Sequence, residues 1–201
     1  MCGRYSIFTE EEIIEIREII SEINQKFGHE TKLKTGEIFP TDTAPILALS
    51  DNSIQAQPMT WGFPRWDKKG VIINAKAETA LEKNMFRAAL LGRRCVVPST
   101  GFYEWQHVDG KAKKDKYLIR LPDTAALYMA GIYNLFRRPD GSEAPVFVIL
   151  TTEANESVGP IHDRMPVILS RDEKEQWLRD TSGIDRILKR AGPALIISKV
   201  S

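Results

Sequence analysis

Cys2, directly after the initiator methionine, is the residue whose position carries the most chemistry. Aminopeptidases remove a methionine that precedes a residue as small as cysteine, so we expect the mature chain to begin at Cys2. An N-terminal cysteine carries an amine and a thiol on adjacent carbons, with ordinary pKa values of about 8 and about 8.5. This pair can condense with an aldehyde to form a Schiff base, which the sulfur closes into a five-membered thiazolidine. The simpler interpretation is an incidental cysteine at a tolerant chain end.

Three further motifs follow the N-terminal one in a fixed order. The four sequences are Met-Cys-Gly-Arg-Tyr at 1–5, Ile-Asn-Ala-Lys-Ala-Glu-Thr at 73–79, Gly-Phe-Tyr-Glu-Trp at 101–105 and Ile-His-Asp-Arg-Met-Pro-Val-Ile-Leu at 161–169. Together they resemble the SRAP (SOS-response-associated peptidase) family of abasic-site processing proteins, which crosslink covalently to DNA. The resemblance implies a lyase-type enzyme that captures the ring-opened aldehyde of an abasic site in single-stranded DNA as a thiazolidine on Cys2.

Capture of an abasic sugar needs a group that moves protons, because the sugar is mostly a closed hemiacetal. Glu104 lies between aromatic residues, Tyr103 before it and Trp105 after it. Such surroundings would raise the pKa of a carboxyl group and let it both donate and accept a proton. The resemblance makes Glu104 the expected general acid/base. From its neighbours alone, it is equally well the outward residue of an alternating strand.

The sequence contains three histidines, of which one matches the family pattern. His29 follows a helix terminator and His107 opens a polar loop, so we expect both to be solvated. The resemblance assigns His162 to the sugar hydroxyl or to proton transfer at the Schiff base. It assigns Asn74 to positioning the N-terminus, since an amide can both donate and accept. The alternatives are a structural histidine and an asparagine that caps the following helix.

Contact with DNA requires cations and rings near these groups. Arg4 and Arg164 are expected phosphate contacts, because a guanidinium group pairs with phosphate through two hydrogen bonds. The segment from Trp61 to Trp66 mixes rings with arginine, which suits stacking on unpaired bases. We expect Trp61 in the core and Trp66 on the surface. The other residues expected to bind DNA are Pro40 and Lys76.

Several positions depart from the family pattern. Lys76 stands where arginine is usual, and Asn84 replaces a basic residue. The segment Glu37-Ile38-Phe39-Pro40 keeps only the proline of the customary Asn-Val-Ala-Pro loop. The sequence also stops at residue 201, where many members continue with an Asn-containing tail. These departures bear on DNA affinity more than on the chemistry of Cys2.

Other classes of protein also begin with Met-Cys-Gly. An N-terminal-nucleophile amidotransferase would use Cys2 to attack glutamine, but we find no signal for a glutamine pocket or an ammonia-acceptor domain. A thiol peptidase would combine Cys2 with His162 and a carboxylate, and its activity could amount to removing its own Met1. A nucleic-acid-binding module with an inert Cys2 is the alternative without catalysis.

Composition favours one globular domain over residues 1–201. The chain is 42% hydrophobic and 27% charged, and it contains neither an apolar run that could span a bilayer nor a basic-then-apolar leader. We therefore expect a cytoplasmic monomer without a membrane partner, metal or cofactor. Two cysteines make no disulfide framework, and Cys95 falls in an apolar run typical of a buried strand. The net charge of +1 means that a DNA surface must be a local patch.

Hydrophobic spacing predicts the helices that frame these motifs. The first helix is expected from a capping box at 9–12 to Gly28, and the second over 78–91 with Leu81, Met85 and Ala88 on one side. The third is expected to begin at the capping box 170–173 and to carry Trp177, and a short fourth lies near 184–191. The apolar positions of the first helix are Ile13, Ile16, Ile20, Ile23 and Phe27.

Short β-type runs fill the space between the helices. The polar segment 107–116 contains Asp109-Gly110 and predicts a hairpin with an exposed basic loop. Many successive strands with helices at the ends indicate an α+β fold with mainly antiparallel strands. The family resemblance implies the same: a curved, barrel-like sheet packed by helices. The expected strands are 46–49, 71–73, 95–97, 117–121, 127–133 and 146–151.

Overall fold

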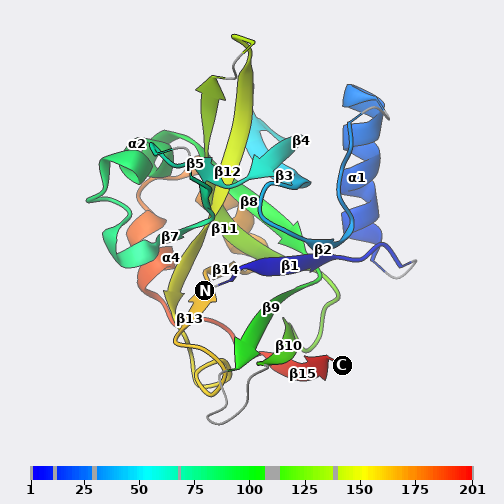
Figure 1. The fold of residues 1–201 in the computed structure, drawn as a ribbon, viewed down its shortest axis with the longest axis vertical. Helices are drawn as coiled ribbons and strands as arrows, with labels where there is room; N and C mark the ends of the chain where they lie inside the picture. Colours follow the sequence, from blue (N-terminus) through cyan, green and yellow to red (C-terminus); the bar gives the residue numbers. More distant parts are fainter. Residues whose placement is uncertain are drawn as a thin grey trace.

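The computed structural model describes residues 2–10, 13–28, 31–67, 69–106, 114–137 and 140–200. Over these residues the fold is α+β and mainly antiparallel, as expected (Figure 1). The helices are α1 (Ile14–Phe27), the 3-10 helix η1 (Ala77–Thr79), α2 (Asn84–Gly92), α3 (Arg171–Arg179) and α4 (Ile184–Lys189). The strands are β1 (Arg4–Ile7), β2 (Gly36–Ile38), β3 (Thr43–Ser50), β4 (Ser53–Trp61), β5 (Phe63–Pro64), β6 (Val71–Ile72), β7 (Asn74–Lys76), β8 (Arg94–Ser99), β9 (Gly101–Gln106), β10 (Asp115–Arg120), β11 (Leu127–Arg137), β12 (Glu143–Glu153), β13 (Arg164–Pro166), β14 (Ile168–Leu169) and β15 (Ile196–Val200).

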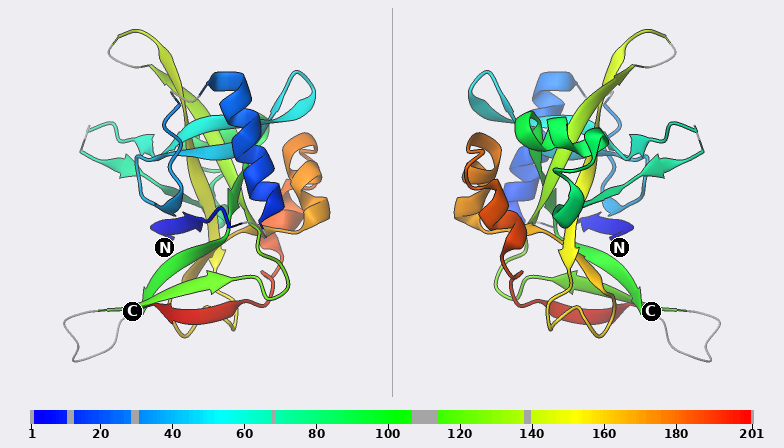
Figure 2. Two further views of the ribbon diagram at one scale, coloured as in Figure 1. Left: turned by 90° about the vertical axis from the view of Figure 1, so that its right-hand side faces the viewer. Right: turned by 90° about the vertical axis from the view of Figure 1, so that its left-hand side faces the viewer.

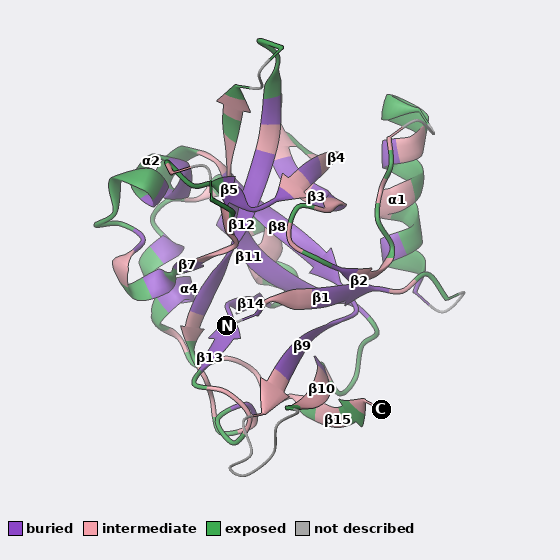
Figure 3. Cartoon of the chain, in the orientation of Figure 1, coloured by how far each residue is buried: buried purple, intermediate pink, exposed green. Residues whose placement is uncertain are grey.

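Five of these strands close into a barrel. Strand β12 pairs with β11 on one side and β4 on the other, and the pairs β4–β3, β3–β8 and β8–β11 complete the ring. Within this ring only the β12–β4 pair is parallel. The strands are mostly buried (Figure 3), and the rings of Trp61 and Phe147 stack with centroids 6.3 Å apart. Cys95 is fully buried on β8, as predicted.

A second sheet lies below the barrel in Figures 1 and 2 and carries two of the four sequence motifs. Its strand order is β15-β10-β9-β1-β2, and every neighbouring pair in it is antiparallel. Strand β1 follows Cys2, and β9 holds Glu104. Strands β9 and β10 form the hairpin predicted across 107–116, whose residues 107–113 lie outside the described part of the chain.

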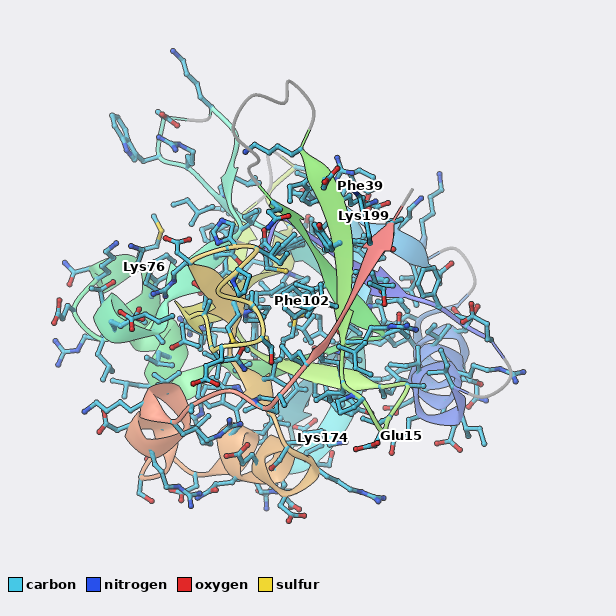
Figure 4. The ribbon with its side chains drawn as sticks, turned by 90° about the horizontal axis from the view of Figure 1, so that it is seen from below. Glu15, Phe39, Lys76, Phe102, Lys174 and Lys199 are labelled. Atoms are coloured by element: carbon cyan, nitrogen blue, oxygen red, sulfur yellow. The ribbon has the colours of Figure 1, made fainter. Side chains whose placement is uncertain are left out.

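Helix α1 packs on strands β3 and β4 and buries Ile16 and Ile23 (Figure 2). Ile13 occupies its N-cap position, and two residues of the predicted capping box, Glu11 and Glu12, lie outside the described residues. A polar contact fixes the helix to the barrel: the hydroxyl of Tyr128 donates to Glu15. The ammonium group of Lys174 lies 3.6 Å from the centroid of the Tyr128 ring and near Glu15 (Figure 4).

The second helix differs from the prediction in both its start and its buried face. Helix α2 begins at Asn84, because residues 77–79 form a 3-10 turn and the chain bends before α-helical periodicity resumes. The predicted face is exposed, with 41% of Leu81 and 39% of Met85 accessible and Ala88 also on the surface. The face that packs on the barrel has its own spacing of three and four residues. It consists of Phe86, Ala89 and Leu90.

Helices α3 and α4 confirm the remaining helix predictions. The Ser170 side chain accepts from the backbone of Glu173, whose carboxylate accepts from the backbone of Ser170, so the capping box is complete. The buried guanidinium of Arg94 donates to carbonyl groups in the last turns of α2 and α3. No helix in the described part of the chain is long and apolar enough to cross a membrane.

Candidate active site

Cys2 lies fully buried at the entrance to β1, and an amide side chain holds its backbone. The Nδ2 group of Asn74 donates to the carbonyl oxygen of Cys2 at 2.9 Å, across 72 positions of sequence. Asn74 begins β7, which runs parallel to β12 at the margin of the barrel. Its Oδ1 atom is buried and has no hydrogen-bond partner within the described ranges. Asn74 therefore contacts the carbonyl oxygen of Cys2, and the predicted role of Asn74 in holding the amine and thiol stays a prediction.

Glu104 faces the same region from β9. It is only 3% exposed, so the sequence alternative of an outward-facing strand residue does not apply. Burial raises the pKa of Glu104, and the positive charge of His162 counteracts part of this effect. A carboxyl group with a raised pKa can donate a proton nearer to neutral pH and can then accept it back.

The thiol of Cys2 has a higher pKa than the thiol of an exposed N-terminal cysteine. Burial raises its pKa, and the nearby charge of Glu104 raises it further. The Sγ atom lies 3.5 Å from the carbonyl oxygen of Arg4, to which it can donate. Cys2 therefore holds a neutral thiol at rest, which differs from the ordinary thiolate fraction assumed from sequence. While Met1 is joined to Cys2, the nitrogen of Cys2 is part of a peptide bond and is not a free amine.

His162 lies just before β13, with a partner for each of its charge states. Its Nδ1 atom accepts from the backbone N–H of Arg164 at 3.0 Å, which requires an unprotonated Nδ1 and places the proton of the neutral ring on Nε2. The same atom lies 2.7 Å from Oδ1 of Asp163, a contact that suits the protonated ring. In Figure 1, β9 lies below β1, with which it pairs, and β13 is drawn close to the N-terminus. The four predicted catalytic residues thus converge from four separate segments: Cys2, Asn74, Glu104 and His162.

Arg164 is buried and engaged within the protein. Its guanidinium donates to both carboxylate oxygens of Glu78, at 2.7 and 2.9 Å, and to the carbonyl oxygen of Thr151 at 2.6 Å. The hydrogen bonds from Arg164 lower the pKa of Glu78. A phosphate would have to replace Glu78 to bind this guanidinium, so the DNA contact of Arg164 stays a prediction. Sequence reasoning missed Glu78, although it belongs to the second motif.

Arg4 lies two residues after Cys2, within a cluster that the sequence did not predict. Its Nη1 atom donates to Glu37 on β2 at 3.0 Å. Lys116 on β10 donates to the same carboxylate at 2.8 and 2.9 Å. Glu37 and Lys116 are 79 positions apart, so no local spacing could have joined them. The cations lie over the rings of Phe39, Tyr103 and Trp105.

The other predicted DNA contacts lie on turns and strand ends. Trp66 is 89% exposed and Trp61 is fully buried, as predicted. Gly62 lets the chain leave β4 toward Trp66: its φ is +116°, and a Cβ there would lie 2.7 Å from Val71 Cγ2. Lys76 is exposed beside the segment that leads to α2 (Figure 4).

Pro40 lies half-buried in the turn between β2 and β3. This turn is closed by Asp42, whose carboxylate accepts from the backbone N–H of Phe39 at 2.9 Å. The DNA-binding roles of these turn and strand-end residues stay predictions. His29 and His107, which we expected to be solvated, lie outside the described residues.

Known proteins share both the sequence pattern and the fold. The family model described as SOS response associated peptidase (SRAP) matches residues 1–201. The abasic site processing protein YoqW of Bacillus subtilis (strain 168) is 35% identical over 189 residues, covering 89% of this chain and 80% of YoqW. YedK of Escherichia coli (strain K12), also named an abasic site processing protein, is 29% identical over 183 residues, covering 89% and 80%. A crystal structure of a protein from Bacteroides thetaiotaomicron matches with a TM-score of 0.83 at 28% identity, covering 100% of this chain and 92% of the other. The four motifs and these matches agree, and the chain belongs to the SRAP family.

Proposed function

We propose that this protein processes abasic sites in single-stranded DNA by capturing their ring-opened aldehyde as a thiazolidine on Cys2, after Met1 has been removed. One observation carries the proposal. Asn74 fixes the backbone of Cys2 at 2.9 Å, and the buried Glu104 is electrostatically coupled both to that cysteine and to His162. The names of the relatives YoqW and YedK support abasic DNA as the substrate.

The first steps open the sugar and join it to the amine. Glu104 in its acid form donates a proton to the ring oxygen as the C1 hydroxyl loses its own, which gives the free aldehyde. The α-amine of Cys2 then attacks the aldehyde carbon, and the resulting carbinolamine loses its hydroxyl as water to form the Schiff base. Asn74 Oδ1, which is buried and accepts from no described group, can take a hydrogen bond from the amine and direct its lone pair toward the substrate.

The final step closes the ring. The Cys2 sulfur attacks the carbon of the protonated C=N bond, whose electron pair moves to the nitrogen, so the nitrogen keeps its proton and becomes a secondary amine while the thiol proton passes to a base. Because burial raises the pKa of the thiol, a neighbouring base must accept this proton as the C–S bond forms. Two bases can take this proton: Glu104 as a carboxylate, which interacts electrostatically with Cys2, and neutral His162, which interacts with Glu104. The net reaction joins protein and DNA with the loss of one water.

The neutral thiol distinguishes this proposal from a thiol peptidase. Thiol peptidases use a pre-formed thiolate whose pKa is lowered by a neighbouring cation. In this protein burial and Glu104 raise the pKa of Cys2 instead. The raised pKa of the Cys2 thiol supports a reaction in which the amine attacks first and the sulfur attacks second. Removal of Met1 frees the α-amine that makes the first attack.

A pair of cysteine variants tests the proposal. Each variant is mixed with a single-stranded oligonucleotide containing one abasic site and analysed on a denaturing gel. Cys2→Ala should give no crosslink, whereas Cys95→Ser should crosslink despite some loss of stability, since Cys95 is a buried residue of β8. Circular dichroism shows that each variant is folded. Full crosslinking by Cys2→Ala would overturn the proposal.

A further inference from the structure

Two cations beside the nucleophile share a single carboxylate. Glu37 accepts from Arg4 at 3.0 Å through Oε1 and from Lys116 at 2.9 and 2.8 Å through both oxygens. The three residues come from β1, β2 and β10 of one sheet, and Glu37 lies on its edge strand. The backbone carbonyl oxygen of Arg4 also accepts a hydrogen bond from the thiol of Cys2. The carboxylate of Glu37 therefore already occupies the place where Arg4 and Lys116 converge, and Arg4 contacts Cys2.

Two aromatic rings lie against each of the two cations. The Arg4 guanidinium lies 4.3 Å from the ring centroid of Phe39 and 5.0 Å from that of Trp105. The Lys116 ammonium lies 4.1 Å from the ring centroid of Tyr103 and 5.6 Å from that of Trp105. Phe39 is 38% exposed and lies at the surface in Figure 4. Cations interleaved with rings are the pattern that tracks a single strand of nucleic acid.

The charged side chains of this cluster are partly exposed, so one anion can replace another there. The side chains of Arg4, Glu37 and Lys116 are 37%, 26% and 23% exposed, so the carboxylate can turn toward solvent without leaving a buried charge. Burial alone would raise the pKa of Glu37, but hydrogen bonds from Lys116 and Arg4 outweigh it and hold the pKa below its usual value. The carboxylate is therefore charged at neutral pH, as a backbone phosphate is.

We propose that Glu37 is an internal competitor that occupies, in the free protein, the place of one backbone phosphate of single-stranded nucleic acid, and that Lys116 is the second cation of that phosphate site. This inference rests on the proposed function, because it supplies the strand that delivers the abasic sugar to Cys2. Binding exchanges one anion for another over Arg4 and Lys116. The exchange lowers affinity for every strand equally, since a phosphate contact carries no sequence information.

The test measures equilibrium binding to an intact single-stranded oligonucleotide, which has no aldehyde and cannot crosslink. Glu37→Gln keeps the shape and removes the charge, so it should bind about three- to tenfold more tightly at low salt, with a log–log salt slope steeper by about 0.7. Lys116→Gln should bind more weakly, with a shallower slope. In the double variant the gain from Glu37→Gln should shrink, because that gain is transmitted in part through Lys116.

Glu175→Gln is the matched control, because Glu175 also pairs with an arginine, Arg179 at 2.8 Å, but on the surface of α3. It should bind like the wild type, which shows that losing one negative charge is not enough. Thermal melting confirms that each variant is folded. Equal or weaker binding by folded Glu37→Gln, or an unchanged slope for Lys116→Gln, overturns the inference. A wild type that captures abasic DNA while Glu37→Gln behaves like Glu175→Gln would overturn only this inference, whereas a wild type that captures no abasic DNA overturns the proposed function.

Discussion

Glu78 and Arg164 form a two-pronged ion pair that joins the segments carrying Asn74 and His162. The guanidinium donates to both carboxylate oxygens, at 2.7 and 2.9 Å. The backbone N–H of the same arginine donates to Nδ1 of His162 at 3.0 Å. On the other side, Glu78 follows β7, whose first residue holds the backbone of Cys2. One ion pair thus connects the segment that contacts Cys2 to the segment that carries His162.

We predict that Glu78→Gln slows capture of abasic DNA by on the order of ten- to hundredfold, because small displacements of reacting groups cost rate on this scale. Its binding to intact single-stranded DNA should remain near that of the wild type. Single-turnover crosslinking and equilibrium binding measure the two effects, with Glu175→Gln as control. Tighter DNA binding by Glu78→Gln would mean instead that Glu78 merely blocks Arg164 from a phosphate.

For Glu104→Gln we expect capture to slow by roughly a hundredfold or more, the usual scale for a lost general acid/base. Glutamine keeps the size of the side chain but can neither release a proton to the ring oxygen nor take one from the thiol. Crosslinking rates measured at several values between about pH 6 and pH 8 test this. Rates equal to those of the wild type throughout this range would make Glu104 a structural residue.

The same substitution should change how stability depends on pH. Burial raises the pKa of Glu104 above its unfolded value of about 4.3, so the folded state holds the proton more tightly. Glu104 therefore contributes stability that is lost as pH rises from about 4.3 through its folded pKa, and Glu104→Gln lacks this contribution. Urea unfolding at about pH 4 and about pH 8 should show the variant gaining on the wild type at the higher pH. A difference independent of pH would show that Glu104 has an ordinary pKa.

Arg94 should be a stability residue without a role in capture. It is 6% exposed, and its guanidinium donates to four carbonyl groups, of Leu90, Leu91, Trp177 and Leu178. Arg94→Met leaves these helix-terminal carbonyls without their donor and should cost at least about 3 kcal/mol of unfolding free energy. Arg179→Met, which removes an exposed ion pair of α3, should cost under about 1 kcal/mol. Equal losses would contradict the capping role of Arg94.

Trp66 is the clearest test of base stacking. Because its side chain is 89% exposed, Trp66→Ala should change the free energy of unfolding by no more than about 0.5 kcal/mol. Binding to single-stranded DNA should weaken by about 1–3 kcal/mol, the range for a lost stacking platform. Ile14→Ala, at an apolar residue of α1 that is 63% exposed, is the control for loss of surface area. Unchanged DNA affinity of Trp66→Ala would remove Trp66 from the DNA path.

Local sequence patterns predicted those helices whose formation depends on residues close together in the sequence. The capping box at Ser170 and the isoleucine spacing of α1 each depend on residues a few positions apart, and both helices are present. The second helix was predicted with the wrong face, because a 3-10 turn at 77–79 resets the periodicity before Asn84. The closure of the barrel by the parallel β12–β4 pair has no local signature, since it joins residues far apart in sequence.

For the candidate site, too, the sequence predicted the individual residues but not the contacts between distant segments. The family motifs predicted Cys2, Asn74, Glu104 and His162 as site residues, but the spacing of single residues could not have shown that four segments converge. The contacts that hold the site together escaped prediction, because each pairs distant positions: Glu78 with Arg164, and Glu37 with Lys116. The burial of the Cys2 thiol, which raises its pKa, was equally invisible from a position at the chain end.

The α-amine distinguishes the aminothiol mechanism from simple thiol chemistry. Met1, or any tag ahead of Cys2, leaves the thiol in place but keeps the nitrogen as an amide, which cannot form a Schiff base. A protein whose N-terminus is blocked in this way should therefore form no stable adduct with abasic DNA. Cleavage by a specific protease that frees Cys2 should restore adduct formation.

Intact mass spectrometry of the blocked and freed proteins, each mixed with abasic single-stranded DNA, tests the central claim most directly. The freed protein should give one adduct whose mass equals protein plus DNA minus one water, and the blocked protein should give none. Adducts of equal yield from both proteins would contradict the thiazolidine mechanism and assign the reaction to the thiol of Cys2 alone.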